Sequence, residues 1–267
     1  MLLIILTTAF LAYGALCMLL FLMQRRMLYY PASSPEAEQR AYAPGADLAP
    51  WVDAAGARIG WKRVPADATQ HWLVFHGNAG LAVQRAYWAD ALERVSPGQA
   101  PAVYILEYPG YSRRPGSPTQ GSLTTAALAA FDAIPGAARI HLLGESLGGA
   151  VAAQVARARP ERVGGLVLVS PFNRLADVAA HHYPWLPVRW LVKDRWESDS
   201  ALRDFSGPVA IIAAERDSIV PAEFSRRLHD GMAGPKRLHV IPGEDHNFFV
   251  FDQAWFREAV AFVTKTE

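Results

Sequence analysis

A serine, an aspartate and a histidine that together could perform nucleophilic catalysis occur in that order in the C-terminal half of the chain. Ser146 is the centre of a G-x-S-x-G pattern, Gly144 to Gly148, between an apolar run and an alanine-rich run. The small flanking residues allow a sharp strand-to-helix turn, which exposes the serine hydroxyl beside a helix N-terminus that favours negative charge. The pattern predicts a nucleophile. The alternative is a glycine-rich turn with a capping serine.

A nucleophilic serine needs a general base, and the base needs a carboxylate that orients it. Asp217 lies a few residues after the apolar run Val209 to Ala214, and His246 lies in a later glycine-containing loop. We therefore expect Asp217 and His246 to complete a catalytic triad with Ser146. Glu215 is the alternative acid, but it lies nearer the strand end, where its carboxylate is expected to point elsewhere or to form a salt bridge.

Two backbone N–H groups should form an oxyanion hole. One belongs to Leu147, directly after the nucleophile, and the other should come from the loop after an earlier strand. That loop is His76-Gly77-Asn78-Ala79-Gly80, whose glycines allow amides to point at an anion. We expect Asn78 to be the second donor, with Ala79 as the alternative. His76 is interpreted as structural, bracing the loop by a hydrogen bond.

The segment between Val169 and Pro208 has no strand character, and three of the eight tryptophans of the chain lie in it. We expect a small helical cap over the active site, residues 171–207, with Phe172, Trp185 and Trp190 lining an apolar substrate pocket. Ordinary packing of aromatic residues between helices is the alternative.

The elements that must position these residues are short apolar strands separated by helical runs after Pro50. The strands are expected at 51–53, 58–64, 72–75, 102–107, 139–143, 163–169, 209–214 and 237–241, the first two as an antiparallel hairpin. This alternation predicts an α/β fold with a doubly wound, mostly parallel sheet. In such sheets ligands bind beyond the carboxyl ends of the strands.

The N-terminal segment Leu2 to Met23 contains 22 residues and no charge, and Arg25, Arg26, Tyr29 and Tyr30 follow it. A helix of this length spans a hydrocarbon core of roughly 30 Å. The pattern predicts a single transmembrane helix with a basic stop signal and an interfacial aromatic belt, and the arginines place the domain in the cytoplasm. A cleaved signal peptide and a buried core helix are the alternatives.

The expected organisation is an N-terminal anchor at 1–30, an irregular connector at 31–50 and the catalytic domain at 51–267. We expect this domain to stay folded, soluble and active when residues 1–30 are removed. The 26 basic and 25 acidic side chains nearly cancel, which argues against a nucleic-acid partner. The single cysteine, Cys17, excludes an intrachain disulfide.

Taken in order, the segments H-G-N-A-G, G-E-S-L-G-G, E-R-D-S-I-V-P and G-E-D-H-N resemble those of the α/β-hydrolase superfamily. The chain is most similar to its membrane-anchored serine hydrolases, the abhydrolase domain-containing proteins. These also begin with an apolar span and a Q-R-x-x-x-Y-x-P-like segment, here Gln24 to Pro31 with one residue more. Family members often have asparagine after H-G-N-A-G, where this chain has Leu81.

The resemblance, which covers nearly the whole chain, implies an α/β-hydrolase fold and hydrolysis of acyl esters, thioesters or lipids without a metal or organic cofactor. An acyltransferase or perhydrolase that uses the same triad is one alternative function. A non-catalytic binding protein with the hydrolase fold is another. The natural substrate and the oligomeric state do not follow from the sequence.

Overall fold

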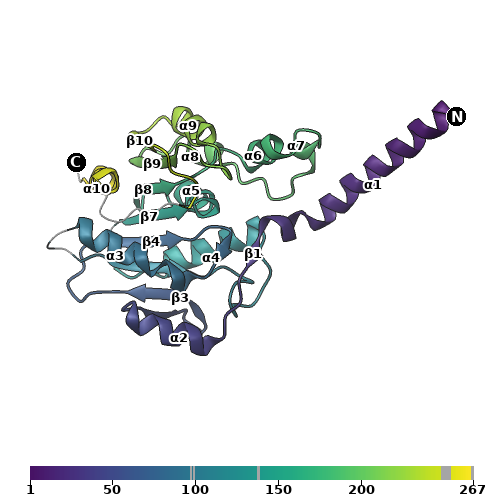
Figure 1. The fold of residues 1–267 in the computed structure, drawn as a ribbon. Helices are drawn as coiled ribbons and strands as arrows, with labels where there is room; N and C mark the ends of the chain where they lie inside the picture. The colour runs from purple at the N-terminus through teal and green to yellow at the C-terminus, as the bar shows by residue number, and fades with distance from the viewer. Residues whose placement is uncertain (97, 99, 137–138, 248–253, 266–267) are drawn as a thin grey trace.

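An eight-stranded, mostly parallel sheet forms the centre of the domain (Figure 1). The computed structural model describes residues 1–267 except 97, 99, 137–138, 248–253 and 266–267. The strands are β2 (Ala49–Val52), β3 (Arg58–Arg63), β4 (His71–Phe75), β6 (Ala102–Leu106), β7 (Ile140–Glu145), β8 (Val163–Val169), β9 (Val209–Ala214) and β10 (Lys236–Ile241). Their order is β10-β9-β8-β7-β4-β6-β3-β2, and only the pairs β2–β3 and β3–β6 are antiparallel. The predicted doubly wound, mostly parallel sheet is confirmed.

Helices cover both faces of the sheet, because alternate side chains of each central strand point to opposite faces. Leu73 and Phe75 of β4 belong to one buried cluster, and Trp72 and Val74 belong to the other. The first cluster includes residues of α4 (Gln120–Asp132), α5 (Leu147–Ala158) and α9 (Ala222–Gly231). The second includes residues of the short helix η1 (Ala82–Arg85), α3 (Ala86–Val95) and α10 (Ala254–Thr264). The result is a three-layer sandwich that fixes the carboxyl ends of the strands.

The segment between β8 and β9 forms the expected helical cap. It contains α6 (Leu175–His182), α7 (Val188–Leu191) and α8 (Ser198–Leu202). The base of the cap is closed by a bridge between Arg174 and Glu197 and by a hydrogen bond from the Ser198 N–H to the Asn173 carbonyl. The cap tip, residues 183–197, therefore projects from a fixed base.

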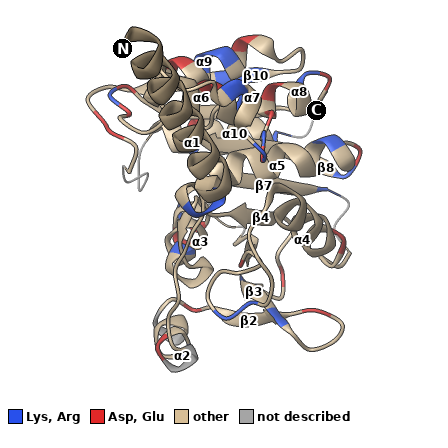
Figure 2. Cartoon of the chain, turned by 90° about the vertical axis from the view of Figure 1, so that its right-hand side faces the viewer, with Lys and Arg blue, Asp and Glu red and all other residues tan. Residues whose placement is uncertain are grey.

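The N-terminal helix α1 (Leu2–Leu28) has 27 residues and is long and apolar enough to cross a membrane, with a mean hydropathy of 2.3 over its most apolar window. Figure 2 shows that its charged residues gather at its C-terminal end. After it, the short strand β1 (Tyr30–Pro31) pairs in parallel with β5 (Ala79–Gly80). The expected irregular connector also contains α2 (Glu36–Gly45), so that expectation was wrong for about half of its length. The end of α1 thus lies against the body of the domain.

The assignment of Tyr29 to an interfacial aromatic belt was wrong, because this side chain is only 2% exposed. Its hydroxyl donates to Asp194 Oδ2 at 3.2 Å and accepts from Trp196 Nε1 at 3.0 Å. Burial, and then the nearby charge of Asp194, raise the pKa of Tyr29, so the hydroxyl keeps its proton. Arg25 also binds Asp194, at 2.9 and 3.1 Å. A domain that lacks residues 1–30 would lose these contacts, and the expectation that it stays folded, soluble and active remains a prediction.

Candidate active site

Ser146 occupies the sharp turn between β7 and α5, with φ +49° and ψ −114°. This left-handed backbone conformation is strained for a residue with a side chain and is typical of functional turns. The turn is also too tight for other side chains. A Cβ on Gly148 would lie 2.1 Å from the Phe75 carbonyl oxygen, and one on Gly144 would lie 2.5 Å from the Gly148 carbonyl oxygen. The glycines of the G-x-S-x-G pattern are thus required by close backbone approach.

Asp217 and His246 lie together beyond the ends of β9 and β10. The His246 ring nitrogen Nδ1 is 2.7 Å from Asp217 Oδ2 and 2.9 Å from Oδ1, and the aspartate side chain is almost fully buried. Asp217 Oδ1 also accepts the backbone N–H groups of Ile219 and Val220. These bonds hold the carboxylate in one orientation, so that its position fixes the imidazole.

The rival acid Glu215 has a different partner. Its Oε2 accepts the backbone N–H of Gly243 at 2.9 Å, which ties the end of β9 to the loop after β10. The sequence analysis missed a similar function for Asp245, whose Oδ1 accepts the backbone N–H groups of Ser218 and His246, each at 2.7 Å. These hydrogen bonds lower the pKa of Asp245, and the bond from the Ser218 N–H has the largest effect. Both carboxylates therefore join the two loops that carry Asp217 and His246.

The loop His76 to Gly80 lies against Ser146, since a Cβ on Gly77 would be 3.9 Å from the Ser146 Cβ. His76 is fully buried, and its Nδ1 is 2.8 Å from the Gly77 carbonyl oxygen, which agrees with a structural function. The Asn78 carbonyl accepts the Tyr30 N–H and the Tyr111 hydroxyl, while Asn78 Nδ2 donates to the Leu28 carbonyl. The end of α1 therefore positions this loop.

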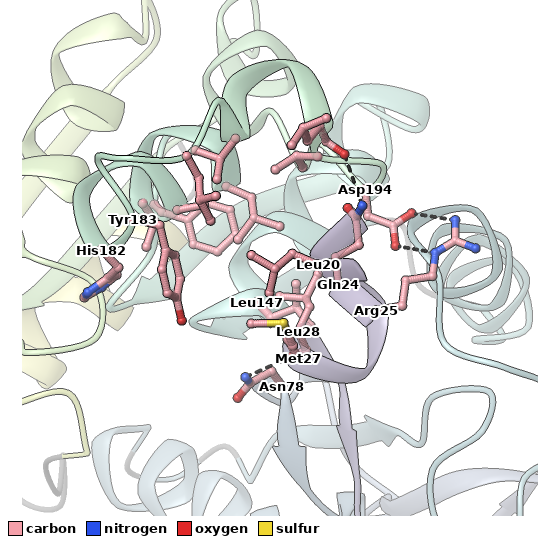
Figure 3. Close-up of a pocket in the computed structure, with 18 of the residues that line it drawn as sticks. Leu20, Gln24, Arg25, Met27, Leu28, Asn78, Leu147, His182, Tyr183 and Asp194 are labelled. Carbon is pink, nitrogen blue, oxygen red and sulfur yellow. Dashed lines mark hydrogen bonds and ion pairs between the residues drawn. The ribbon is translucent and has the colours of Figure 1, made fainter. Parts of the chain in front are cut away.

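A pocket of about 560 Å³ lies between the cap and α1 (Figure 3). Ser146, Leu147 and Asn78 all line it. Phe172 and Trp185 line it as expected, whereas Trp190 does not and is 84% exposed. The expectation for Trp190 was wrong because α7 turns this side chain outwards. The remaining lining residues are Leu16, Leu20, Phe21, Gln24, Arg25, Met27, Leu28, Tyr30, Leu175, Val178, Ala179, His182, Tyr183, Leu186, Val188, Leu191, Val192, Asp194, Ile219 and Val220.

His246 is not among the lining residues, and the hydrogen bonds of the described part of the chain do not join it to Ser146. Its loop continues into residues 248–253, which lie outside the described residues. The structure thus shows the aspartate–histidine pair and the half-buried serine as two parts of one edge of the sheet. Within the described residues, His, Cys, Asp and Glu side chains do not form groups of three or more that could hold a metal ion.

The comparison with known proteins agrees with the fold. Residues 71–197 match the family model described as the alpha/beta hydrolase fold. An uncharacterized protein of Mycobacterium tuberculosis is 38% identical over 86% of this chain and 83% of its own length. The chain belongs to the α/β-hydrolase family.

Two further relatives place this α/β hydrolase among known enzymes and structures. The lysophosphatidylserine lipase ABHD12 of Danio rerio is 30% identical over 62% of the chain and 48% of its own length. The crystal structure of a hydrolase from Pseudomonas aeruginosa has a TM-score of 0.60 at 20% identity and covers 82% of the chain and 99% of its own length. The first relative supports hydrolase chemistry, and the second shows the shared fold.

The α1 side of the pocket is the part of the site that sequence reasoning missed in this α/β hydrolase. Gln24 Nε2 donates to the Leu191 carbonyl, and Gln24 Oε1 accepts the Lys193 N–H. The signal that could have indicated a tertiary function was a polar glutamine directly after a long apolar helix, in the segment that resembles the family pattern. Its partners lie 167 and 169 residues away in the sequence.

Proposed function

We propose that the protein is a serine hydrolase that cleaves a carboxylic ester or thioester of an apolar acyl substrate through an acyl-enzyme intermediate. The observation that carries the proposal is Ser146, which lies half-buried at a strained turn and lines a largely apolar pocket. The buried Asp217 paired with His246 at 2.7 Å supports it.

The chemistry follows from the hydrogen-bonding directions. His246 Nδ1 donates its proton to Asp217, which leaves Nε2 as the acceptor for the Ser146 hydroxyl proton. As the serine oxygen attacks the acyl carbonyl, His246 takes the proton and then gives it to the leaving group. Asp217 stabilises the imidazolium. Water, deprotonated by His246, then attacks the acyl-enzyme, releases the acid and restores Ser146.

The backbone N–H groups of Leu147 and Asn78 are the proposed oxyanion donors. Leu147 is the first residue of α5, so its N–H has no partner within the helix and lies at the positive end of the helix dipole. Asn78 lies in the loop that faces Ser146 and lines the same pocket. The hydrogen bond from the Asn78 side chain to the Leu28 carbonyl helps to hold this loop in place.

The apolar lining favours a substrate with a hydrocarbon acyl group. A named lipase among the relatives supports a lipid or another small acyl ester. The apolar helix α1 supports attachment to a membrane, and Arg25 and Arg26 at its end favour a cytoplasmic domain. An acyltransferase or perhydrolase would use the same groups with an alcohol or a peroxide in place of water.

The test is covalent labelling by a fluorophosphonate probe, together with hydrolysis of p-nitrophenyl esters. Ser146→Ala should abolish labelling and lower turnover by several orders of magnitude, because the triad acts as a unit. Ser200→Ala, an exposed serine on α8, is the matched control and should behave as the wild type. Full labelling of the Ser146→Ala variant would refute the assignment. Absence of labelling in the wild type would favour a non-catalytic binding protein.

A further inference from the structure

One face of α1 forms a wall of the pocket. Leu16, Leu20, Gln24 and Met27 recur at intervals of three or four residues, which places them on one face of the helix, and all four line the pocket. Leu19, on another face, is 52% exposed and does not line it. The labelled Leu20, Gln24, Met27 and Leu28 point into the same space as Leu147 and Tyr183 in Figure 3. The helix therefore contributes directly to the binding site.

The same face of α1 is joined to the cap by hydrogen bonds along three turns. The Tyr13 hydroxyl donates to the Trp185 carbonyl at 2.8 Å, and Gln24 bonds to the backbone on either side of Val192. The Arg25–Asp194 ion pair completes this contact. In hydrocarbon, backbone polar groups need partners inside the protein, and these bonds supply several of them. The helix and the cap tip thus form one unit.

The part of the cap beside α1 is apolar and exposed. Residues 183–192 read Y-P-W-L-P-V-R-W-L-V, with one charged residue. Tyr183 is 41% exposed, Trp185 55% and Trp190 84%. The one charge, Arg189, is paired with Asp177 at 3.3 Å. Aromatic side chains with polar edges are typical of the membrane interface, and exposed apolar clusters of this kind mark a binding surface.

The depth that α1 reaches in a membrane indicates what covers the exposed apolar surface of residues 183–192. The 11 residue-to-residue steps from Tyr13 to Gln24 correspond to a rise of about 16 Å, whereas a bilayer core is roughly 30 Å thick. If α1 crosses the membrane with Gln24 at the interface, Tyr13 lies deep in the leaflet. Trp185, which is hydrogen-bonded to Tyr13, must then lie there too. A spanning α1 and an aqueous cap tip are thus incompatible.

We propose that α1 and residues 183–192 enter the same leaflet as one unit, and that the pocket between them takes a single-chain lipid ester directly from the membrane. This inference rests on the proposed function, since the ester carbonyl is placed at Ser146. The acyl chain lies along the α1 face from Leu28 to Leu16, a rise of about 18 Å. Carbon–carbon bonds of about 1.5 Å in a zigzag give roughly 14 carbons for this length.

The absence of a free cation inside the pocket agrees with this orientation. Arg25 is the one Lys or Arg among the described residues that line it, and Asp194 neutralises it. An anionic or zwitterionic head group therefore has no charged partner there, so the acyl chain is the part of the substrate that enters between α1 and the cap. The leaving group stays at the Ser146 end.

The first experiment uses the full-length protein reconstituted in phosphatidylcholine vesicles, with long-chain monoacylglycerol and p-nitrophenyl butyrate as substrates. Leu20→Trp should narrow the channel and lower the ratio of long-chain to short-chain kcat/KM at least tenfold. Leu19→Trp, one residue away on the other face, should leave this ratio unchanged. Monoacylglycerol in the same vesicles as the protein should be cleaved at least tenfold faster than an equal amount in separate vesicles.

The second experiment measures depth without catalysis. In a Cys17→Ser background, a nitroxide is attached after Trp190→Cys on the cap, or after Arg226→Cys on the exposed side of α9 as the control. In vesicles, the label at position 190 should collide more with oxygen than with a water-soluble nickel chelate. The label at position 226 should show the reverse.

The outcomes separate this inference from the proposed function. An inactive wild type that no serine probe labels overturns both. An active enzyme with equal ratios in Leu20→Trp and Leu19→Trp, or with equal rates for the two vesicle arrangements, overturns the membrane route alone. A label at position 190 that is as accessible to the nickel chelate as the label at position 226 also overturns it, whatever the activity.

Discussion

Asp194 joins the N-terminal helix to the cap, and its replacement by alanine should destabilise the protein. Its side chain is 5% exposed and accepts hydrogen bonds from Arg25 and from the buried Tyr29 hydroxyl. A buried donor that loses its partner costs about 1–3 kcal/mol. The Arg25 side chain is 47% exposed and can be solvated, so its lost pairing adds about 0–1 kcal/mol. We expect a total loss of roughly 2 kcal/mol in the free energy of unfolding.

The assay is thermal unfolding of the full-length protein in detergent, followed by the change in tryptophan fluorescence. For a domain of this size, about 2 kcal/mol corresponds to a fall in Tm of about 4–8 °C. Glu197→Ala is the control, because Glu197 and Arg195 form an exposed pair at 3.7 Å, which contributes about 0–1 kcal/mol. Equal Tm values for the Asp194→Ala variant and the wild type would refute the view that α1 is bound to the cap through this carboxylate.

Three further predictions concern the Asp217–His246 pair, the turn at Ser146 and the loss of stability at acid pH. Asp217→Asn should lower turnover by about 10⁴ by misplacing the imidazole, whereas Glu215→Gln should lower it far less. If steady-state kinetics showed the larger loss of turnover for Glu215→Gln, Glu215 would be the acid. Gly148→Ala should prevent correct folding, because its Cβ would lie 2.1 Å from the Phe75 carbonyl oxygen, and circular dichroism and soluble yield would show this. Burial, and then the nearby Arg139, lower the pKa of His141 to about 4. As the pH falls, His141 is therefore protonated in the unfolded chain before it is protonated in the folded protein. The free energy of unfolding should decrease between about pH 6.5 and pH 4 by about 3 kcal/mol at most. His141→Gln should reduce this decrease when the free energy of unfolding by urea is measured at a series of pH values.

The strands and the sharp turn at Ser146 could be predicted because their signals are local. A buried parallel strand is a short apolar run, and β8 and β9 occur at the predicted residues. The tight turn at Ser146 needs small residues close by in the sequence, so its glycines indicate it directly. Because these signals are local, the α/β-hydrolase fold and family could be predicted from the sequence, and both predictions were confirmed.

What the sequence did not predict depends on partners that are distant in the chain. Tyr29 looked like an interfacial aromatic residue because its partners Asp194 and Trp196 lie 165 and 167 residues away. Trp190 was assigned to the pocket on composition alone, and the rotation of a four-residue helix cannot be read from such a short segment. The helix α2 had a usable signal, Ser34 and Pro35 before good helix formers, which was outweighed by the proline content of the segment.

The contact between α1 and the cap constrains which face of α1 each residue can occupy, and therefore the spacing of residues along this helix. One inserted residue between Leu20 and Gln24 would turn the preceding part of the helix by about 100° and move Leu16 and Leu20 away from the pocket. An insertion before Tyr13 would only lengthen the free end. In related chains, the length of the helix before the position of Tyr13 should therefore vary. The number of residues between the positions of Tyr13 and Tyr29 should stay constant.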